Sequence, residues 1–269
     1  MKYKIISMDF DGTLLTSDKK VSDKNKKILL NFKKEKYIIV GITARNLSSV
    51  KNVCDINMFN YIILNNGAYI YDVENKDTTT LSEIDKKVAV KITDYFEKDA
   101  YQIDYCSLNK YYIYKNENID NREFFKKVKS IDEVKEKIAR MNVFIKDNIK
   151  IKNSLEYIKN NYKNLEVIEM SDTDTKNSKT WLAFTSKGTN KLETLKKLCL
   201  KLDIDINEVI FFGDGGNDLS IISNVGLGVA MGNALEEVKN KAKKITLSNN
   251  EDGIAYFLEK ILHKSDKIW

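Results

Sequence analysis

The sequence contains no proline, a single histidine and only three cysteines. The lone histidine, His263, gives little support to a histidine-dependent phosphatase or a Ser-His-Asp hydrolase, because both need an imidazole beside other catalytic groups. The cysteines, Cys54, Cys106 and Cys199, lie far apart and form no CxxC pair. They therefore indicate neither a disulfide framework nor a zinc site, which fits a reducing compartment.

Long hydrophobic runs are also missing. The sequence has no apolar stretch of about 18 residues, the length needed to cross a bilayer. Its first residues lack the apolar core of a secretory signal. We therefore expect a cytoplasmic protein without a membrane partner.

Composition and charge are those of an ordinary globular protein. Of 269 residues, 42% are apolar and 31% are charged, and the length suits one large domain or two modest ones. The formal net charge is +6, but arginine occurs only as Arg45, Arg122 and Arg140. Because the lysines are spread along the chain and no arginine-rich arm is present, we expect no nucleic-acid partner. A monomer or weak homodimer is the expected state.

Both ends of the chain alternate between short β-branched or apolar runs and amphipathic helices. The expected strands lie at residues 3–10, 37–43, 61–64, 209–213, 227–230 and 244–247. The expected helices lie at residues 22–36, 47–54, 189–202, 217–223, 234–242 and 252–262. This rhythm predicts a parallel sheet connected by βαβ crossovers.

The middle of the chain has a different texture. It shows a helical pattern at 82–98, two or three further helical stretches within 120–162, and strand-like runs at 101–107, 110–115, 165–170 and 180–185. We interpret its tyrosines as half-buried sheet residues rather than as the lining of a substrate pocket. The prediction is an α/β fold: a Rossmann-like, doubly wound core formed by residues 1–81 and 187–269, split by an inserted α+β cap at 82–186.

The first motif with chemical potential is DFDGT at residues 9–13. Asp9 and Asp11 are two positions apart at the end of an expected strand, so both side chains face the same way. They would lie at the carboxyl edge of the sheet, where open α/β sheets bind ligands, and Gly12 permits a tight turn there. One carboxylate could attack phosphorus while the other transfers protons. The alternative is an ordinary Asx turn.

The second motif, GDGGND at residues 213–218, also follows an apolar strand. Asp214 and Asp218 offer the carboxylate oxygens that Mg²⁺ prefers, and the glycines between them allow close approach of a ligand. The alternative is a turn followed by a helix that Asn217 or Asp218 caps.

Two weaker motifs supply a hydroxyl and an ammonium group. Thr43 ends an expected strand just before a helix, where a hydroxyl and free backbone N–H groups could cradle a phosphate. Its alternative is a helix-capping threonine. The sequence KGTNK at residues 187–191 places a lysine where it could neutralise both an aspartate and a phosphate, unless that lysine is simply a solvated surface residue.

In chain order these four motifs resemble those of the haloacid dehalogenase superfamily. The resemblance covers essentially the whole chain, and the pairing of DxDGT with GDxxND is specific. The sequence NNGA at residues 65–68 and the position of the insert are similar to the Cof-type branch, which carries an α/β cap of the C2 type. One departure is Ala44, where the family usually has glycine after the threonine. Ala44 can still donate its backbone N–H.

The resemblance implies a role for each acidic residue. Asp9 would be the nucleophile that forms an aspartyl-phosphate, and Asp11 would protonate the leaving oxygen and then activate water. Mg²⁺ would be held by the Asp9 carboxylate, the Asp11 backbone carbonyl and Asp214. Asp218 would support the metal through water or outer-shell bonds.

It also implies how the phosphate is held. Thr43, Ala44, Gly12 and Asn217 would bind or position it. For the catalytic lysine the family register favours Lys191 over Lys187, which leaves a choice that only geometry can test.

We therefore expect a Mg²⁺-dependent phosphatase acting on a small phosphomonoester such as a sugar phosphate, a nucleotide or a phosphorylated cofactor. A phosphomutase of the phosphomannomutase type is the nearest alternative. A non-catalytic protein that binds phosphorylated metabolites is the alternative of another class, although the presence of both Asp9 and Asp11 argues against it.

Overall fold

The computed structural model describes residues 2–116, 121–146, 148–171 and 180–262, so His263 lies outside the described residues. The chain packs into two compact units. The first consists of Met1–Ala44, Val50–Thr79 and Asn190–Trp269, and the second of Arg45–Ser49 and Thr80–Thr189. None of the helices within the described ranges is long and apolar enough to span a membrane.

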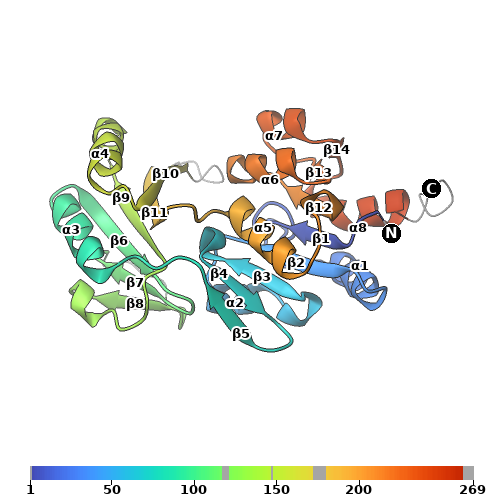
Figure 1. Cartoon of the computed structure of the whole chain (residues 1–269), viewed down its shortest axis with the longest axis horizontal. Coiled ribbons are helices and arrows are strands. Elements are labelled where there is room, and N and C mark those ends of the chain that lie inside the picture. The colour runs from blue at the N-terminus through green and yellow to red at the C-terminus, as the bar shows by residue number, and fades with distance from the viewer. Residues whose placement is uncertain (1, 117–120, 147, 172–179, 263–269) are drawn as a thin grey trace. The chain divides into compact units, whose positions relative to one another are not determined.

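The first unit is built on a mostly parallel sheet (Figure 1). Its strand order is β14-β13-β12-β1-β2-β3-β4-β5. The bounds are β1 Ile5–Met8, β2 Ile38–Ile42, β3 Tyr61–Leu64, β4 Tyr69–Asp72, β5 Asp77–Thr80, β12 Val209–Gly213, β13 Leu227–Ala230 and β14 Lys244–Ile245. Every pair from β14 to β3 is parallel, and β4 runs antiparallel to β3. This arrangement confirms the predicted α/β class with a parallel-sheet core.

Helices connect the parallel strands. They are α1 Asp23–Lys34, α2 Leu47–Val53, α5 Lys191–Lys201, α6 Leu219–Asn224, α7 Glu236–Lys241 and α8 Gly253–Phe257. α1 packs with α8, and α5 packs with α6. α1 begins as the sequence predicts, because the Ser22 hydroxyl accepts the Asn25 N–H at 3.1 Å. Its apolar face buries Ile28, Leu29 and Phe32.

Single helical turns complete the connections. They are Ile56–Met58, Asn65–Gly67, Ile131–Glu133, Ile206–Glu208, Gly216–Asp218 and Asn249–Glu251, with a wider final turn at Leu258–Leu262.

Three neighbouring strands end at the same edge of the first sheet. β1 lies between β12 and β2, with Met8 opposite both Phe212 and Gly41. Because the three strands are parallel and in register, the residues that follow them lie side by side. These residues are Asp9, Thr43 and Asp214, so the fold alone gathers three of the predicted site residues.

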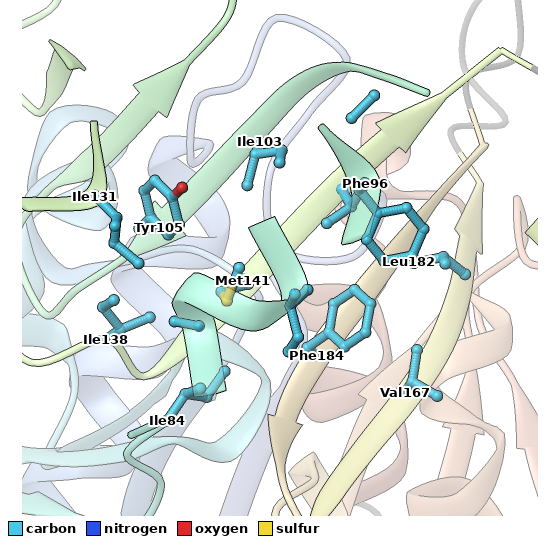
Figure 2. Packing of buried hydrophobic residues seen from close by; sticks show 14 of the residues in the cluster. Ile84, Phe96, Ile103, Tyr105, Ile131, Ile138, Met141, Val167, Leu182 and Phe184 are labelled. Carbon is cyan, nitrogen blue, oxygen red and sulfur yellow. The ribbon is translucent and has the colours of Figure 1, made fainter. Parts of the chain in front are cut away.

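The second unit is a six-stranded sheet covered by helices. Its order is β10-β11-β9-β6-β7-β8, and all neighbours are antiparallel except β7 and β8. The bounds are β6 Ala100–Cys106, β7 Tyr111–Tyr114, β8 Phe125–Val128, β9 Arg140–Ile145, β10 Leu165–Ser171 and β11 Thr180–Ser186, with helices α3 Lys86–Phe96 and α4 Asn148–Asn161. Figure 2 shows the apolar cluster of this unit, in which Phe96 of α3 lies with Tyr105, Met141 and Phe184 of the sheet.

The prediction of two or three helical stretches within residues 120–162 missed two strands. The described part of this region holds the strands β8 and β9, the single turn Ile131–Glu133 and one long helix, α4. In β9 the apolar Met141, Val143 and Ile145 are buried in the core and alternate with Arg140 and Asn142, which is the period of a strand. Pairing on both sides, with β6 and β11, fixes this segment as an extended strand.

Truncating Phe184 tests the core of the second unit. Its ring is fully buried and contacts Phe96, with ring centroids 6.1 Å apart. Phe184→Ala should lower the free energy of unfolding by about 3–5 kcal/mol, because it removes buried surface and leaves a cavity. Urea denaturation followed by circular dichroism measures the loss. Ile149→Ala, at a side chain that is 73% exposed, is the control and should change stability little. Equal losses in both variants would contradict this account.

Candidate active site

A buried lysine joins two carboxylates at the edge of the first sheet. Lys191 Nζ lies 2.6 Å from Asp9 Oδ1 and 2.9 Å from Asp218 Oδ1. The lysine is only 4% exposed, and both partners are buried. Charges in such a position must be paired, so the three side chains hold one another in place.

The position of Lys191 is set by the start of α5. Asn190 caps this helix, with its Oδ1 accepting the Glu193 N–H at 2.9 Å. The hydroxyl of Thr194 in the first turn donates to the Gly67 carbonyl at 2.7 Å. Gly67 has a φ of +105°, and a Cβ there would lie 2.5 Å from the Asn190 carbonyl oxygen. The turn after β3 therefore packs directly against the start of α5 and anchors it.

Asp218 is held by hydrogen bonds at both oxygens. Oδ1 faces Lys191, and Oδ2 accepts the N–H groups of Asp214 and Gly215 at 3.1 and 3.2 Å. An ordinary N-terminal cap accepts N–H groups that follow it in the chain. The Asp218 side chain instead accepts the N–H groups of preceding residues, so the alternative of an ordinary cap does not describe it. The arrangement fixes the backbone that carries Asp214.

Asp214 lies beside Asp9 and Asp218, and one oxygen of each carboxylate lies within 4.8 Å of the others. Asp214 Oδ1 accepts the Thr13 hydroxyl at 2.5 Å. Its other oxygen lies against Gly12, where a Cβ would stand 2.2 Å away. Gly12 also has a φ of +79°, so both the turn and this close approach require glycine.

The electrostatics of the cluster favour a bound cation. Burial raises the pKa of Asp9 well above its usual range, and repulsion by Asp218 and Asp214 adds to this despite the opposing Lys191. Burial likewise raises the pKa of Asp214 to about 6. The pKa of Lys191 is raised in spite of its burial, because Asp218 and Asp9 attract the ammonium. Three carboxylates thus face one ammonium, and a hard divalent cation would relieve the excess negative charge.

The donor set fits such an ion. Asp9 Oδ2 and Asp214 Oδ2 take no part in the bonds to Lys191 and Thr13, so each carboxylate keeps an oxygen for a ligand. Both oxygens of Asp218 are already used. Asp218 is therefore suited to support the metal from outside its ligand shell.

The second aspartate of the first motif is more open. Asp11 is half-buried, and its carboxylate forms an ion pair with Lys19 at 3.2 Å. The turn that carries it is held by Asn233, whose amide donates to the Gly12 carbonyl at 2.8 Å. Asp11 therefore lies on the accessible side of the turn, where it can meet a substrate and water.

Thr43 is buried and lies directly after β2, one residue beyond the observed end of the strand that was expected to include it. Its N–H donates to the Ile63 carbonyl at 2.9 Å, and its own carbonyl accepts the Asn66 N–H at 3.0 Å. The cap of α2 is Asn46, whose Oδ1 accepts the Ser49 N–H at 2.8 Å, so the interpretation of Thr43 as the helix cap is wrong. The half-buried Ala44 follows Thr43 in the same unit.

The remaining predicted residues differ in exposure. Lys187 is exposed and belongs to the second unit, whereas Lys191 contacts Asp9. Asn217 is exposed on the turn between Asp214 and Asp218. The structure thus distinguishes the two lysines by their contacts and exposure, whereas the sequence pattern only favoured one over the other.

Sequence reasoning assigned no role to two residues of this site. Thr13 is the last residue of DFDGT, and its hydroxyl orients Asp214. Asn66 has a φ of +57° and joins the turn after β3 to Thr43. Thr13 depends on a partner 201 positions away, which no local signal reveals. The consecutive asparagines before Gly67 do signal left-handed backbone.

Comparison with known proteins identifies the family of this chain. The model of the family described as haloacid dehalogenase-like hydrolase matches residues 6–258. A 5-amino-6-(5-phospho-D-ribitylamino)uracil phosphatase of Bacillus subtilis is 28% identical over 261 residues, which cover 94% of this chain and 93% of that protein. A putative phosphatase of Haemophilus influenzae is 29% identical over 265 residues, or 96% of this chain and 98% of that protein.

A solved structure of a haloacid dehalogenase-like hydrolase from B. subtilis is also similar. It superposes with a TM-score of 0.80 at 25% identity, covering 96% of this chain and 99% of that one. The resemblance seen in the four motifs is thereby confirmed over nearly the whole sequence. The chain belongs to the haloacid dehalogenase-like hydrolase family.

Proposed function

We propose that this protein is a Mg²⁺-dependent phosphatase that hydrolyses small phosphomonoesters through an aspartyl-phosphate intermediate. The observation that carries the proposal is the buried cluster in which Lys191 contacts Asp9 beside Asp214. The phosphatase names of the relatives support the reaction class. The name of the B. subtilis relative supports a phosphorylated cofactor precursor as one kind of substrate, beside sugar phosphates and nucleotides.

The chemistry divides between the two aspartates of the first motif. Asp9 attacks phosphorus, so a bond forms from its carboxylate oxygen as the bond to the leaving oxygen breaks. Asp11 gives its proton to the leaving oxygen and then takes one from the water that attacks the phosphorus of the intermediate. Inorganic phosphate leaves, and the Asp9 carboxylate is restored. The accessible position of Asp11 suits this exchange with substrate and water.

Charge must be neutralised for an anion to attack a phosphate dianion. Lys191 lies against Asp9 and can also face the phosphate oxygens. Asp9, Asp214 and the backbone carbonyl of Asp11 would hold Mg²⁺, with Asp218 in support. When bound, the ion would offset negative charge on the carboxylates and the phosphate.

The phosphate itself would be positioned at the strand ends. We assign this role to the Thr43 hydroxyl, the Ala44 N–H, the turn at Gly12 and the exposed Asn217. We further assign substrate selection to the cap, which the sequence places at residues 82–186. These groups follow three neighbouring strands of one sheet, which suits precise positioning.

Removal of the nucleophile tests the covalent step. Asp9→Asn should release no inorganic phosphate from p-nitrophenyl phosphate, because an amide is a poor nucleophile. Phosphate release is measured with Mg²⁺ and with a chelator, and only wild type with Mg²⁺ should be active. Borohydride trapping should mark Asp9 during turnover of the wild type. Turnover by Asp9→Asn at the rate of the wild type would exclude the covalent mechanism.

Incubation with a hexose 1-phosphate tests the alternative of a phosphomutase. Formation of an isomerised sugar phosphate without free phosphate would indicate a phosphomutase.

Removal of one metal ligand tests the cation site. Asp214→Asn should weaken Mg²⁺ binding by 10-fold or more, on the order of 1.4 kcal/mol, since it removes a carboxylate ligand. Titration calorimetry with Mg²⁺ alone measures this without turnover. The matched control is Asp203→Asn, at an exposed residue whose φ of +55° asparagine also adopts. Unchanged Mg²⁺ affinity in Asp214→Asn would exclude the proposed site.

Alanine variants of two glycines distinguish the effect of a close atomic contact from the effect of backbone strain. Gly12 and Gly188 both have positive φ, at +79° and +73°, but only Gly12 has an atom where a Cβ would lie. Gly12→Ala should abolish most phosphatase activity by displacing Asp214. Gly188→Ala should lose only stability, on the order of 1–2 kcal/mol. Activity assays and thermal unfolding of both variants measure the two effects, and similar activity in both would refute the claim.

A further inference from the structure

The loop after β13 bonds to both turns that carry the proposed Mg²⁺ ligands. β13 lies beside β12 in the first unit (Figure 1), and the loop occupies residues 231–235. The side-chain amide of Asn233 donates to the Gly12 carbonyl at 2.8 Å. Two residues later, the Leu235 N–H donates to the Asp214 carbonyl at 3.2 Å. One short loop therefore contacts the turn after β1 and the turn after β12.

The loop is itself anchored to the first unit. Met231 and Ala234 are buried, and the Gly232 N–H donates to the Leu247 carbonyl at 3.0 Å. A Cβ at Gly232 would lie 2.8 Å from the backbone nitrogen of Ser248, so the two segments of backbone pack in direct contact. Because the loop is fixed on this side, the groups that it bonds on the other side are held relative to each other.

Both ends of the Asn233 amide are used. Its Nδ2 donates to Gly12, and its Oδ1 accepts the Asn249 N–H at 2.9 Å. A carboxylate has no donor and an apolar side chain has neither group, so an amide is suited to both bonds. Asn249 is buried, and its own side chain donates to the Leu15 carbonyl at 2.8 Å. The two asparagines thus hold the turn after β1 at two of its carbonyl groups.

The bond from Asn233 fixes a peptide group beside the proposed cation site. The peptide between Gly12 and Thr13 has its carbonyl bonded to Asn233, and its N–H donates back within the turn at 3.3 Å. The Thr13 hydroxyl, which follows this peptide, donates to Asp214 at 2.5 Å. The Asp11 carbonyl belongs to the preceding peptide. Rotation of the fixed peptide would therefore displace groups on both sides of it.

We propose that Asn233 is a positioning residue for the Mg²⁺ site, on which it acts through the Gly12 carbonyl. It sets the separation between the Asp11 carbonyl and Asp214, two proposed ligands that different turns carry. Mg²⁺ demands near-ideal octahedral geometry, so a small change in this separation weakens its binding. The inference rests on the proposed function, because it assigns to Asn233 a role toward the metal of the phosphatase.

Mg²⁺ titration of two asparagine variants tests this role. Asn233→Ala should weaken Mg²⁺ binding by about 3- to 10-fold, the range expected for the loss of one hydrogen bond. The matched control is Asn250→Ala, because Asn250 is also exposed and bonds to the same N-terminal segment, but at Ser17. It should keep the affinity of the wild type. Calorimetry with Mg²⁺ alone measures both, and the fitted stoichiometry reports the folded fraction separately from the affinity.

Hydrogen exchange of the metal-free protein tests the hold on the turn directly. Peptides that contain residues 9–15 should exchange faster in Asn233→Ala than in the wild type, because the turn loses a bond that limits its opening. The same peptides should exchange at the rate of the wild type in Asn250→Ala. A lower melting temperature of Asn233→Ala with unchanged exchange in this turn would indicate a general stabilising role and would overturn the inference.

The Mg²⁺ dependence of turnover gives a kinetic measurement of the same role. In Asn233→Ala the Mg²⁺ concentration for half-maximal phosphate release from p-nitrophenyl phosphate should rise by the same factor as the dissociation constant. At saturating Mg²⁺ the rate should approach that of the wild type, because a positioning residue takes no part in the chemical step. A low rate that Mg²⁺ does not restore would contradict positioning of the metal.

Mg²⁺ binding and phosphate release distinguish this inference from the proposed function. Equal Mg²⁺ affinity of the wild type and Asn233→Ala, or equal weakening in Asn250→Ala, would refute the inference alone. Normal Mg²⁺ binding by a wild type that releases no phosphate would refute the phosphatase, and weaker binding by Asn233→Ala would still support the positioning role. Absence of Mg²⁺ binding by the wild type would refute both.

Discussion

The contact of Lys191 with Asp9 and Asp218 is the interaction on which the geometry of the candidate site depends. It joins residues 182 and 27 positions apart, so it forms only when β1, the start of α5 and the turn after β12 are all in place. Loss of one partner in a buried ion pair leaves an uncompensated charge, at a cost of about 3–5 kcal/mol. The same contact that orders Asp9 therefore also couples the candidate site to the stability of the core.

The parallel sheet explains how a few residues, distant in sequence, form the candidate site. β12, β1 and β2 are adjacent and in register, and each is followed directly by a polar residue at one edge of the sheet. The glycine turns then bring backbone close to the carboxylates, as at Gly12 beside Asp214. An excess of buried negative charge results, and such an excess suits the binding of a cation.

Local sequence patterns predicted the helices and strands whose apolar residues form one continuous buried face. Asp9 and Asp214 could be placed because apolar runs precede them, and Lys191 because the four motifs occur in a familiar order. The role of Thr13 could not be predicted, since its partner is distant in sequence. β9 lies in a region where only helical stretches were expected, because its alternation is short and its strand state depends on pairing with the distant β6 and β11. Tyr111 was expected to be a half-buried sheet residue, and it is one, in β7.

The second unit is not one contiguous insert, because it includes the segment Arg45–Ser49. This segment follows Ala44 in the first unit but bonds to the second, where the N–H groups of Asn46 and Leu47 donate to the Tyr111 hydroxyl and the Leu108 carbonyl. A chimera that exchanged only the contiguous insert with that of a relative would break these bonds. The module that evolution or an engineer can transplant intact is therefore discontinuous, and it includes a short piece of chain that begins two residues after Thr43.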